Sequence, residues 1–374
     1  MGPARAAQCS PVRMNKKRIL IYCLVFLILA VLVYFQFRTW KNFDWNTFWA
    51  EWELLQPWKI LAGIGLIYGS YVLRAIRWKV FLRPVRREAS LAGIVPATVI
   101  GFTGLALLGR PGELIRPYLI ARREALNFSS QMAVWTVERI FDIGAFTVLL
   151  VLAVFLPGTA IHDVPDYSGV RIFGLLFLVL VAAMAVTAII VARRGEAVSR
   201  WVEQRFSHLA ANLGHRIAQR LREFHQGLDT IHSPSAFFQI TAVSLVMWFC
   251  IGLAYREVIY SYGSSLQMMT MSKIFPLMGS SMVGSLIQLP GVGGGSQLAT
   301  ISALQHVFGV SHELAASCGI LLWLATFVSV VPVGLVLAQF ERLSLRKLSK
   351  ESSQEEQARA TGEPASPKPA SPLL

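Results

Sequence analysis

Residues 101–142 read GFTGLALLGRPGELIRPYLIARREALNFSSQMAVWTVERIFD, and they combine two apolar runs with several charged residues. The first run stops at the turn-forming segment Gly109–Glu113. The second run carries Glu138, Arg139 and Asp142 near its start. Charged residues inside membrane-length apolar segments are energetically costly, so their default interpretation is functional. We expect the rest of the chain to hold this stretch in a lipid bilayer.

The composition is typical of a helical membrane protein. Of the 374 residues, 54% are hydrophobic and 15% are charged, whereas soluble domains carry about 25% charged residues. Several apolar runs approach the length of about 20 residues that spans a bilayer, and they are continuous rather than alternating, which argues against a membrane β-barrel. The fold class we predict is therefore an all-α polytopic membrane protein.

The basic residues indicate orientation rather than nucleic-acid binding. The formal net charge is +14, and the positive residues lie mostly at the ends of apolar runs and within 193–229, which is the positive-inside pattern. We therefore expect no nucleic-acid partner. The four cysteines and seven histidines show no metal-ligand spacing, and no nucleophile and base are paired in the sequence. We expect no metal, no cofactor and no enzymatic activity.

Six full spans are expected, with both termini in the cytoplasm. Residues 1–18 form a basic N-terminus, and 193–233 form an amphipathic cytoplasmic segment that lies either on the inner leaflet or in solvent. Residues 343–374 form a disordered tail behind a transmembrane domain of residues 19–342. The six spans are 19–37, 58–82, 129–156, 170–192, 236–260 and 314–340.

Two further apolar segments, 91–121 and 266–309, are expected to form re-entrant hairpins. The returning arm 113–121 is far shorter than the roughly 20 residues of a span. The alternative is that the first arm crosses and every later segment is inverted, but this would place Arg122 and Arg123 outside, against the positive-inside rule. Hairpins entering from opposite sides predict an inverted repeat, which is typical of transporters.

Arg110 and Arg116 flank the bend of the first hairpin. Free backbone N–H groups at a helix start attract anions, and the arginine fork fits phosphate. We therefore predict that Arg110, Glu113 and Arg116 contribute to a substrate site for a phosphate-bearing headgroup. The alternative is that both arginines only pair with Glu113 and nearby carboxylates.

On the following helix, Arg139 and Asp142 are spaced i and i+3, so we expect them to form an ion pair. Glu138 and Asp142 share a face, which leaves one acid for Arg110 or Arg116. The favoured role is a structural clamp between this helix and the hairpin, with substrate contact by Arg139 or a proton relay as alternatives.

Two other groups of residues are candidates for the site. The loop of Gly293, Gly294 and Gly295, followed by Gln297, opens a helix at the second hairpin and could form an anion nest or a flexible turn. Arg74 and Arg77 lie deep at the cytoplasmic end of the second span and either snorkel or contact a headgroup.

These motifs resemble the transmembrane region of lysylphosphatidylglycerol synthases over about residues 18–342. The resemblance rests on Gly109–Glu113 with Arg116, on Glu138-Arg139-x-x-Asp142, on the loop 290–295 and on the pair Arg77-Trp78. That family includes stand-alone flippase-like membrane proteins. Its glycine loop is typically followed by glutamate, where this chain has Gln297. Bifunctional members carry a soluble aminoacyl-transferase domain after the membrane region, and the resemblance does not extend to it.

The resemblance implies a flippase-like transporter that moves an anionic phospholipid or a polyprenyl-phosphate-linked lipid across the bacterial cytoplasmic (inner) membrane. Arg110, Arg116 and Arg139 would hold the phosphate, and Glu138 and Asp142 would order them. The alternative is a non-transporting accessory protein of cell-envelope lipid or glycolipid synthesis, with the synthetic enzymes as partners. The sequence predicts neither the oligomeric state nor the direction of transport.

Overall fold

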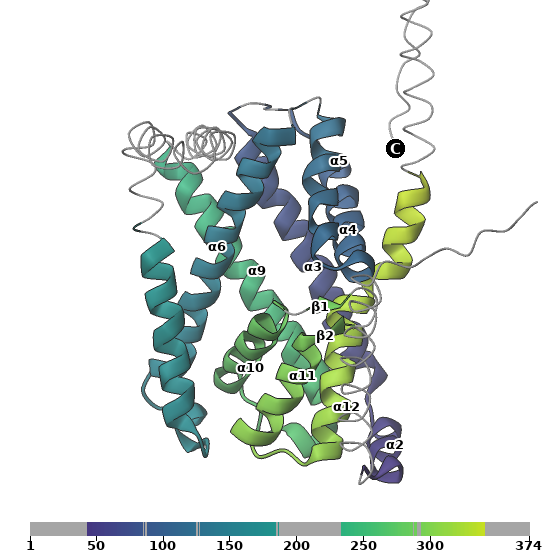
Figure 1. The fold of residues 1–374 in the computed structure, drawn as a ribbon, viewed down its shortest axis with the longest axis vertical. Helices are drawn as coiled ribbons and strands as arrows, with labels where there is room; N and C mark the ends of the chain where they lie inside the picture. Colours follow the sequence, from purple (N-terminus) through teal and green to yellow (C-terminus); the bar gives the residue numbers. More distant parts are fainter. Residues whose placement is uncertain are drawn as a thin grey trace, which may run out of the picture.

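The computed structural model describes residues 43–186 and 233–340, apart from 85, 87, 125, 127, 185, 287 and 290–292. This part is helical except for one two-residue β-ladder, and its long helices run along the long axis (Figure 1). Several expected segments lie outside the described residues: 1–18, 19–37, 343–374 and nearly all of 193–233.

Five helices are long and apolar enough to cross a membrane. A further helix, α6 (Phe128–Phe155), has 28 residues but includes Glu138, Arg139 and Asp142. The expected spans that fall in the described part therefore correspond to long helices. The five are α3 (Pro57–Leu82), α4 (Leu91–Leu108), Tyr167–Met184, α9 (Pro234–Tyr260) and the composite helix His312–Phe340, which contains α12 (His312–Trp323) and the π-helical turn η6 (Leu324–Val328).

A short aromatic helix, α2 (Trp45–Glu53), packs against α12 at one end of the molecule. Asp44 caps it by accepting hydrogen bonds from the backbone N–H groups of Asn46 and Thr47. The hydroxyl of Thr47 also donates to Asp44, and these hydrogen bonds lower the pKa of the Asp44 carboxyl below its usual range. Because Phe48 is buried in contact with Phe43 while Trp45 and Trp49 are exposed, the helix presents an aromatic face outward.

The first helical hairpin consists of α4, the 3₁₀ helix η1 (Arg110–Leu114) and α5 (Ile115–Arg123). Gly109 has a φ of 69°, a conformation that favours glycine, and it ends α4 at the expected bend. The two arms touch at glycines, because a Cβ added at Gly112 would collide with the backbone of Gly104. The returning arm therefore packs directly against α4.

The second hairpin consists of α10 (Met271–Gly284) and α11 (Gly295–Ser302), which continues into the π-helical turn η5 (Ala303–Val307). Strands β1 (Gln288–Leu289) and β2 (Gly293–Gly294) pair antiparallel at its tip. The arms again meet at a glycine, because a Cβ added at Gly284 would collide with the carbonyl of Gly295. Glycine therefore allows close packing of the arms in both hairpins.

The two hairpins lie at opposite ends of the bundle, with their tips at mid-height. Figure 1 shows α4 and α5 in the upper half, α10 and α11 in the lower half, and β1 and β2 between them. Among the described residues, the tips are joined by a hydrogen bond in which Nη2 of Arg110 donates to the carbonyl of Ser285 at 2.9 Å. Segments 175 residues apart in the sequence thus enclose the middle of the molecule.

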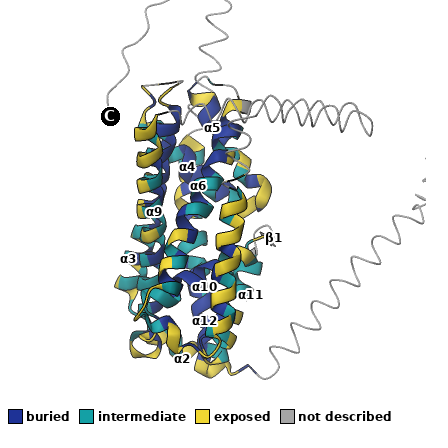
Figure 2. Ribbon diagram, turned by 90° about the vertical axis from the view of Figure 1, so that its left-hand side faces the viewer, coloured by how far each residue is buried: buried dark blue, intermediate teal, exposed yellow. Residues whose placement is uncertain are grey.

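The buried apolar residues form separate clusters along the bundle, and Figure 2 marks the buried stretches of the helices in dark blue. On α6, Val134 and Val137 belong to the cluster shared with α3, α4 and α5. Phe146 and Leu150 belong to the cluster shared with α9, α10 and α12. Glu138 and Asp142 fall between the two clusters, so the charged segment of α6 lies at the level where the hairpins meet.

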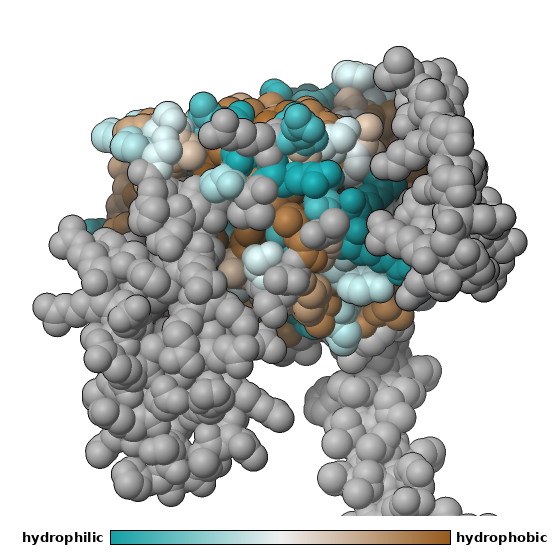
Figure 3. All heavy atoms as spheres, turned by 90° about the horizontal axis from the view of Figure 1, so that it is seen from above, coloured by the Kyte–Doolittle hydropathy of each residue, from teal (hydrophilic) through white to brown (hydrophobic). Residues whose placement is uncertain are grey.

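Basic side chains gather at the end of the bundle that carries the start of α4 and the end of α5. Arg122 and Arg123 are exposed there, and Arg86 pairs with Glu124 at 3.4 Å. Arg83 donates to the side chain of Gln239. Hydrophilic side chains stand out against apolar ones when the molecule is viewed from this end (Figure 3).

Candidate functional site

A buried ion network joins α3 to α6 in the middle of the bundle. Arg77 is fully buried, and its Nη2 donates to Glu138 at 2.6 Å. Its Nη1 donates to Asp142 at 2.7 Å and to the Ser244 hydroxyl of α9 at 2.8 Å. One guanidinium group therefore bridges both carboxylates of α6. A buried charge of this kind requires such partners because leaving water is costly.

Two more arginines complete the network. Arg116 of α5 makes a two-pronged ion pair with Glu138, and its guanidinium lies 4.5 Å from the ring centre of Trp78. Arg74 of α3 donates to Asp142 at 3.1 Å. The Arg116–Glu138 pair links the first hairpin to α6, as the clamp interpretation requires.

The prediction that Arg139 pairs with Asp142 is wrong, because no hydrogen bond or ion pair joins these two residues. Asp142 instead accepts hydrogen bonds from Arg74, Arg77 and the indole of Trp248. Packing of α3 and α9 against α6 brings these donors to the carboxylate, and this tertiary arrangement overrides the local i, i+3 spacing. Within the described residues, Arg139 has no ion-pair partner.

Arg139 is held by an aromatic contact. Its guanidinium lies 5.3 Å from the ring centre of Trp135, and its Nε is buried without a hydrogen-bond partner among the described residues. The side chain lines a cavity, together with Arg74 and Asp142. It is thus a cation with unused donors at the wall of a cavity.

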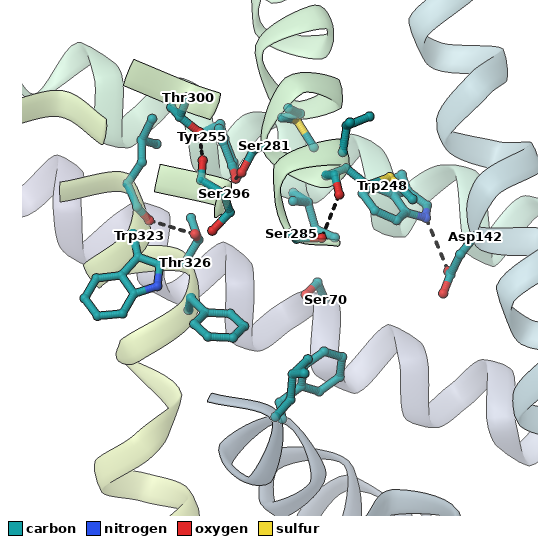
Figure 4. Close-up of a pocket in the computed structure, with 18 of the residues that line it drawn as sticks. Ser70, Asp142, Trp248, Tyr255, Ser281, Ser285, Ser296, Thr300, Trp323 and Thr326 are labelled. Carbon is teal, nitrogen blue, oxygen red and sulfur yellow. Dashed lines mark hydrogen bonds between the residues drawn. The ribbon is translucent and has the colours of Figure 1, made fainter. Parts of the chain in front are cut away.

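The cavity has a volume of about 450 Å³ and lies between the two hairpins, α3, α6 and α9. Arg110 and Glu113 border it from the first tip, where they pair with each other at 2.9 Å. Hydroxyl groups border it from the second hairpin and from the helix that follows. Figure 4 shows these residues with Asp142 and Trp248 on the opposite side: Ser281, Ser285, Ser296, Thr300 and Thr326.

Those hydroxyl-bearing residues and Trp248 were not predicted from the sequence. The only available signal was the abundance of serine and glycine in α10, which is also common in structural contacts between membrane helices. Their helices turn one face to the cavity. Because these helices are hydrophobic on all sides, the sequence pattern does not show which face that is.

The glycine tip of the second hairpin is a cap for α11. The backbone N–H of Gly294 donates to the side-chain oxygen of Gln297 at 3.1 Å, and Gly294 has a φ of 112°. An amide oxygen accepts this bond as a carboxylate would, so Gln297 fills the capping position without a charge. Gln297 also borders the cavity, whereas Gly294 and Gly295 do not.

The structure thus separates the predicted site residues into two groups. Arg74, Arg110, Glu113, Arg139 and Gln297 line the cavity together with Asp142. Arg77, Arg116 and Glu138 are buried behind its wall, where they pair with one another.

Long apolar helices, a buried ion network and two hairpins that meet over a basic cavity define a multi-pass membrane protein with a central polar site. Residues 20–334 match the family described as the lysylphosphatidylglycerol synthase TM region, and the chain belongs to this family. No curated protein and no solved structure matches the chain. The family confirms the resemblance seen in the sequence and indicates a membrane protein related to lipid handling.

Proposed function

We propose that the protein is a flippase-like transporter that moves an anionic lipid across the cytoplasmic membrane. The observation that carries this proposal is the excess of positive charge around the cavity. Five arginines surround three carboxylates there. In a low-dielectric environment, uncompensated positive charge favours the binding of an anion. The arginines are Arg74, Arg77, Arg110, Arg116 and Arg139, and the carboxylates are Glu113, Glu138 and Asp142.

The apolar border of the cavity supports a lipid rather than a water-soluble anion. Leu180, Val283 and Leu286 line the cavity and are also exposed. An acyl or polyprenyl chain can follow these side chains out of the cavity while the headgroup stays among the arginines. A substrate with a charged head and an apolar tail uses both parts of the cavity.

The hairpins would supply the two sides of the pathway. In this proposal, α4–α5 enters from the cytoplasmic side, because its open end carries Arg122 and Arg123 and positive residues favour that side. The α10–α11 hairpin enters from the opposite side, and the two form an inverted repeat around a central site, as in many transporters. Movement of one hairpin against the other would expose the cavity to each leaflet in turn.

Reconstitution into vesicles tests the proposal. Fluorescent anionic phospholipids and polyprenyl phosphates should exchange between leaflets faster with the protein than without it. The Arg139→Gln variant should lose this exchange and keep its thermal stability, since Arg139 has no ion-pair partner among the described residues. Arg256→Gln is the matched control, because it removes the same charge from a residue that does not line the cavity.

Exchange equal to that of protein-free vesicles for every anionic lipid would contradict the transporter proposal. Lipid binding without exchange would favour the alternative of a non-transporting accessory protein, which presents lipid to enzymes of cell-envelope synthesis.

A further inference from the structure

The positive charge around the cavity is unevenly distributed. Its location indicates which class of lipid headgroup the cavity can bind. We propose that the cavity binds a lipid phosphomonoester, whose phosphate carries two negative charges, between the guanidinium groups of Arg74 and Arg139. This inference rests on the anionic-lipid transporter proposed above and specifies which headgroup the cavity accepts.

The first excess charge comes from the buried network. Arg74, Arg77 and Arg116 share the two carboxylates of Glu138 and Asp142. Three guanidinium groups and two carboxylates leave one positive charge uncompensated among the described residues. Arg77 is bonded to both carboxylates and Arg116 to both oxygens of Glu138, whereas Arg74 makes a single hydrogen bond to Asp142. Arg74 is therefore the least compensated of the three.

The second excess charge is Arg139. It forms no ion pair in the described part of the chain and lies against the Trp135 ring, although it is close enough to Glu138 and Asp142 to attract both carboxylates. The remaining arginine at the cavity, Arg110, is paired with Glu113 and adds no net charge.

Both uncompensated arginines line the cavity, whereas Arg77 and Arg116 lie behind it. The Nε atoms of Arg74 and Arg139 are buried and have no hydrogen-bond partner among the described residues. Each side chain also has terminal N–H groups that make no hydrogen bond among the described residues, since Arg74 uses only Nη1 for Asp142 and Arg139 makes a ring contact with Trp135. Arginine donors from α3 and α6 in one cavity match the tetrahedral oxygens of a phosphate group.

A phosphomonoester balances these two charges. It carries about −1.5 to −2 at pH 7 and has three terminal oxygens that accept hydrogen bonds, while a phosphodiester carries one negative charge and two such oxygens. Ser281 and Ser296 border the same cavity and can donate to the remaining oxygens, whereas the hydroxyl of Ser285 already donates to the carbonyl of Met282. The monoester is therefore the headgroup that leaves least charge uncompensated.

The test compares two lipids that differ by one methyl group and one charge. The full chain is placed in nanodiscs of zwitterionic lipid, and binding of phosphatidic acid and phosphatidylmethanol with identical acyl chains is measured at pH 8. Phosphatidic acid should bind about tenfold more tightly, because its extra charge forms a further charge-assisted contact. Equal affinities would contradict the inference.

Substitutions test which residue produces the preference for phosphatidic acid. Arg139→Gln should reduce the affinity ratio to near one, Arg139→Lys should restore part of it, and Arg256→Gln should leave it unchanged. A ratio that survives Arg139→Gln would contradict the assignment to this residue.

Titration of the unmodified protein provides an independent measurement. The ratio of the affinities for phosphatidic acid and phosphatidylmethanol should fall as the pH drops through the second pKa of the phosphate, which is about 6. The carboxylates of Glu113, Glu138 and Asp142 face the same arginines. Phosphatidylmethanol, whose single phosphate charge does not change between pH 8 and 5, is therefore the control for any change in the protein itself. A ratio that is independent of pH between 8 and 5 would contradict the inference.

The headgroup assignment and the transporter proposal can be contradicted independently of each other. Preferential binding of phosphatidic acid without leaflet exchange would contradict transport and support the headgroup assignment. Exchange of both lipids at equal rates and with equal affinities would support transport and contradict the assignment.

Discussion

At the scale of single residues, Glu138 and Asp142 are each held by more than one arginine. Glu138 is fully buried and contacts Arg77 and Arg116, while Asp142 contacts Arg74 and Arg77. Because Arg77 and Arg116 come from separate elements, the pairs fix α3, α5 and α6 relative to one another. Arg139 makes no ion pair among the described residues and lies against the ring of Trp135, so neighbours in sequence have different partners.

The Glu138→Gln substitution tests the structural role of the network. It keeps the shape of the side chain but removes the negative charge that Arg77 and Arg116 share, and we expect it to destabilise the protein by roughly 3–5 kcal/mol. Thermal unfolding of the detergent-solubilised protein measures this loss. Glu257→Gln, which removes the partner of the partly exposed Arg256, should cost less than about 1 kcal/mol. Equal unfolding temperatures for Glu138→Gln and the unmodified chain would refute the network's role.

The partners of these residues could be predicted from the sequence only in part. Charges within an apolar helix predicted a polar centre, and one acid was expected to reach the hairpin, where Glu138 meets Arg116. The local spacing suggested that Arg139 pairs with Asp142, but Arg77 reaches Asp142 at 2.7 Å from α3. Helix rotation and packing decide such choices, and neither is encoded in the spacing along one helix.

At the scale of secondary-structure elements, each hairpin depends on direct contact between its arms. In the first, Gly112 lies against the backbone of Gly104, and in the second, Gly284 lies against that of Gly295. The turn Gly109–Glu113 was predicted because glycine and proline interrupt an apolar run. The close approach of the arms could not be predicted, since glycines with open space around them, such as Gly144, have the same appearance in the sequence.

We expect Gly112→Ala to destabilise the first hairpin by about 1–3 kcal/mol, because the added methyl group must displace the backbone of α4. Unfolding temperature and the yield of monodisperse protein are the measurements. Gly144→Ala is the matched control: nothing lies within 4 Å of the added Cβ on α6, and alanine favours the helix. Identical behaviour of the two variants would show that the arms are not in close contact.

At the scale of the whole molecule, the arrangement of two hairpins implies a specific membrane topology. Ser90 and Arg122 lie at the two ends of the first hairpin and are exposed. If the hairpin is re-entrant, both residues face the cytoplasm, while Asp163 in the exposed loop after α6 faces outward. Apolar runs and basic ends predicted this topology from the sequence, whereas the meeting of the tips required long-range packing.

Cysteine labelling in cells tests the topology. In a chain whose four native cysteines are replaced, Ser90→Cys and Arg122→Cys should react with a membrane-impermeant maleimide only after permeabilisation. Asp163→Cys should react in intact cells. Opposite accessibility of the Ser90 and Arg122 positions would mean that α4 crosses the membrane and that the hairpin interpretation is wrong.

The central claim is that an anionic lipid headgroup sits in the cavity between the two hairpin tips. The most direct measurement is a cryo-electron-microscopy structure of the full chain in nanodiscs containing phosphatidic acid. We predict headgroup density between Arg74 and Arg139, with phosphate oxygens within hydrogen-bond distance of both guanidinium groups. Lipid density confined to the outer perimeter, with Arg139 turned away from the cavity to pair with a carboxylate of its own chain, would contradict the claim.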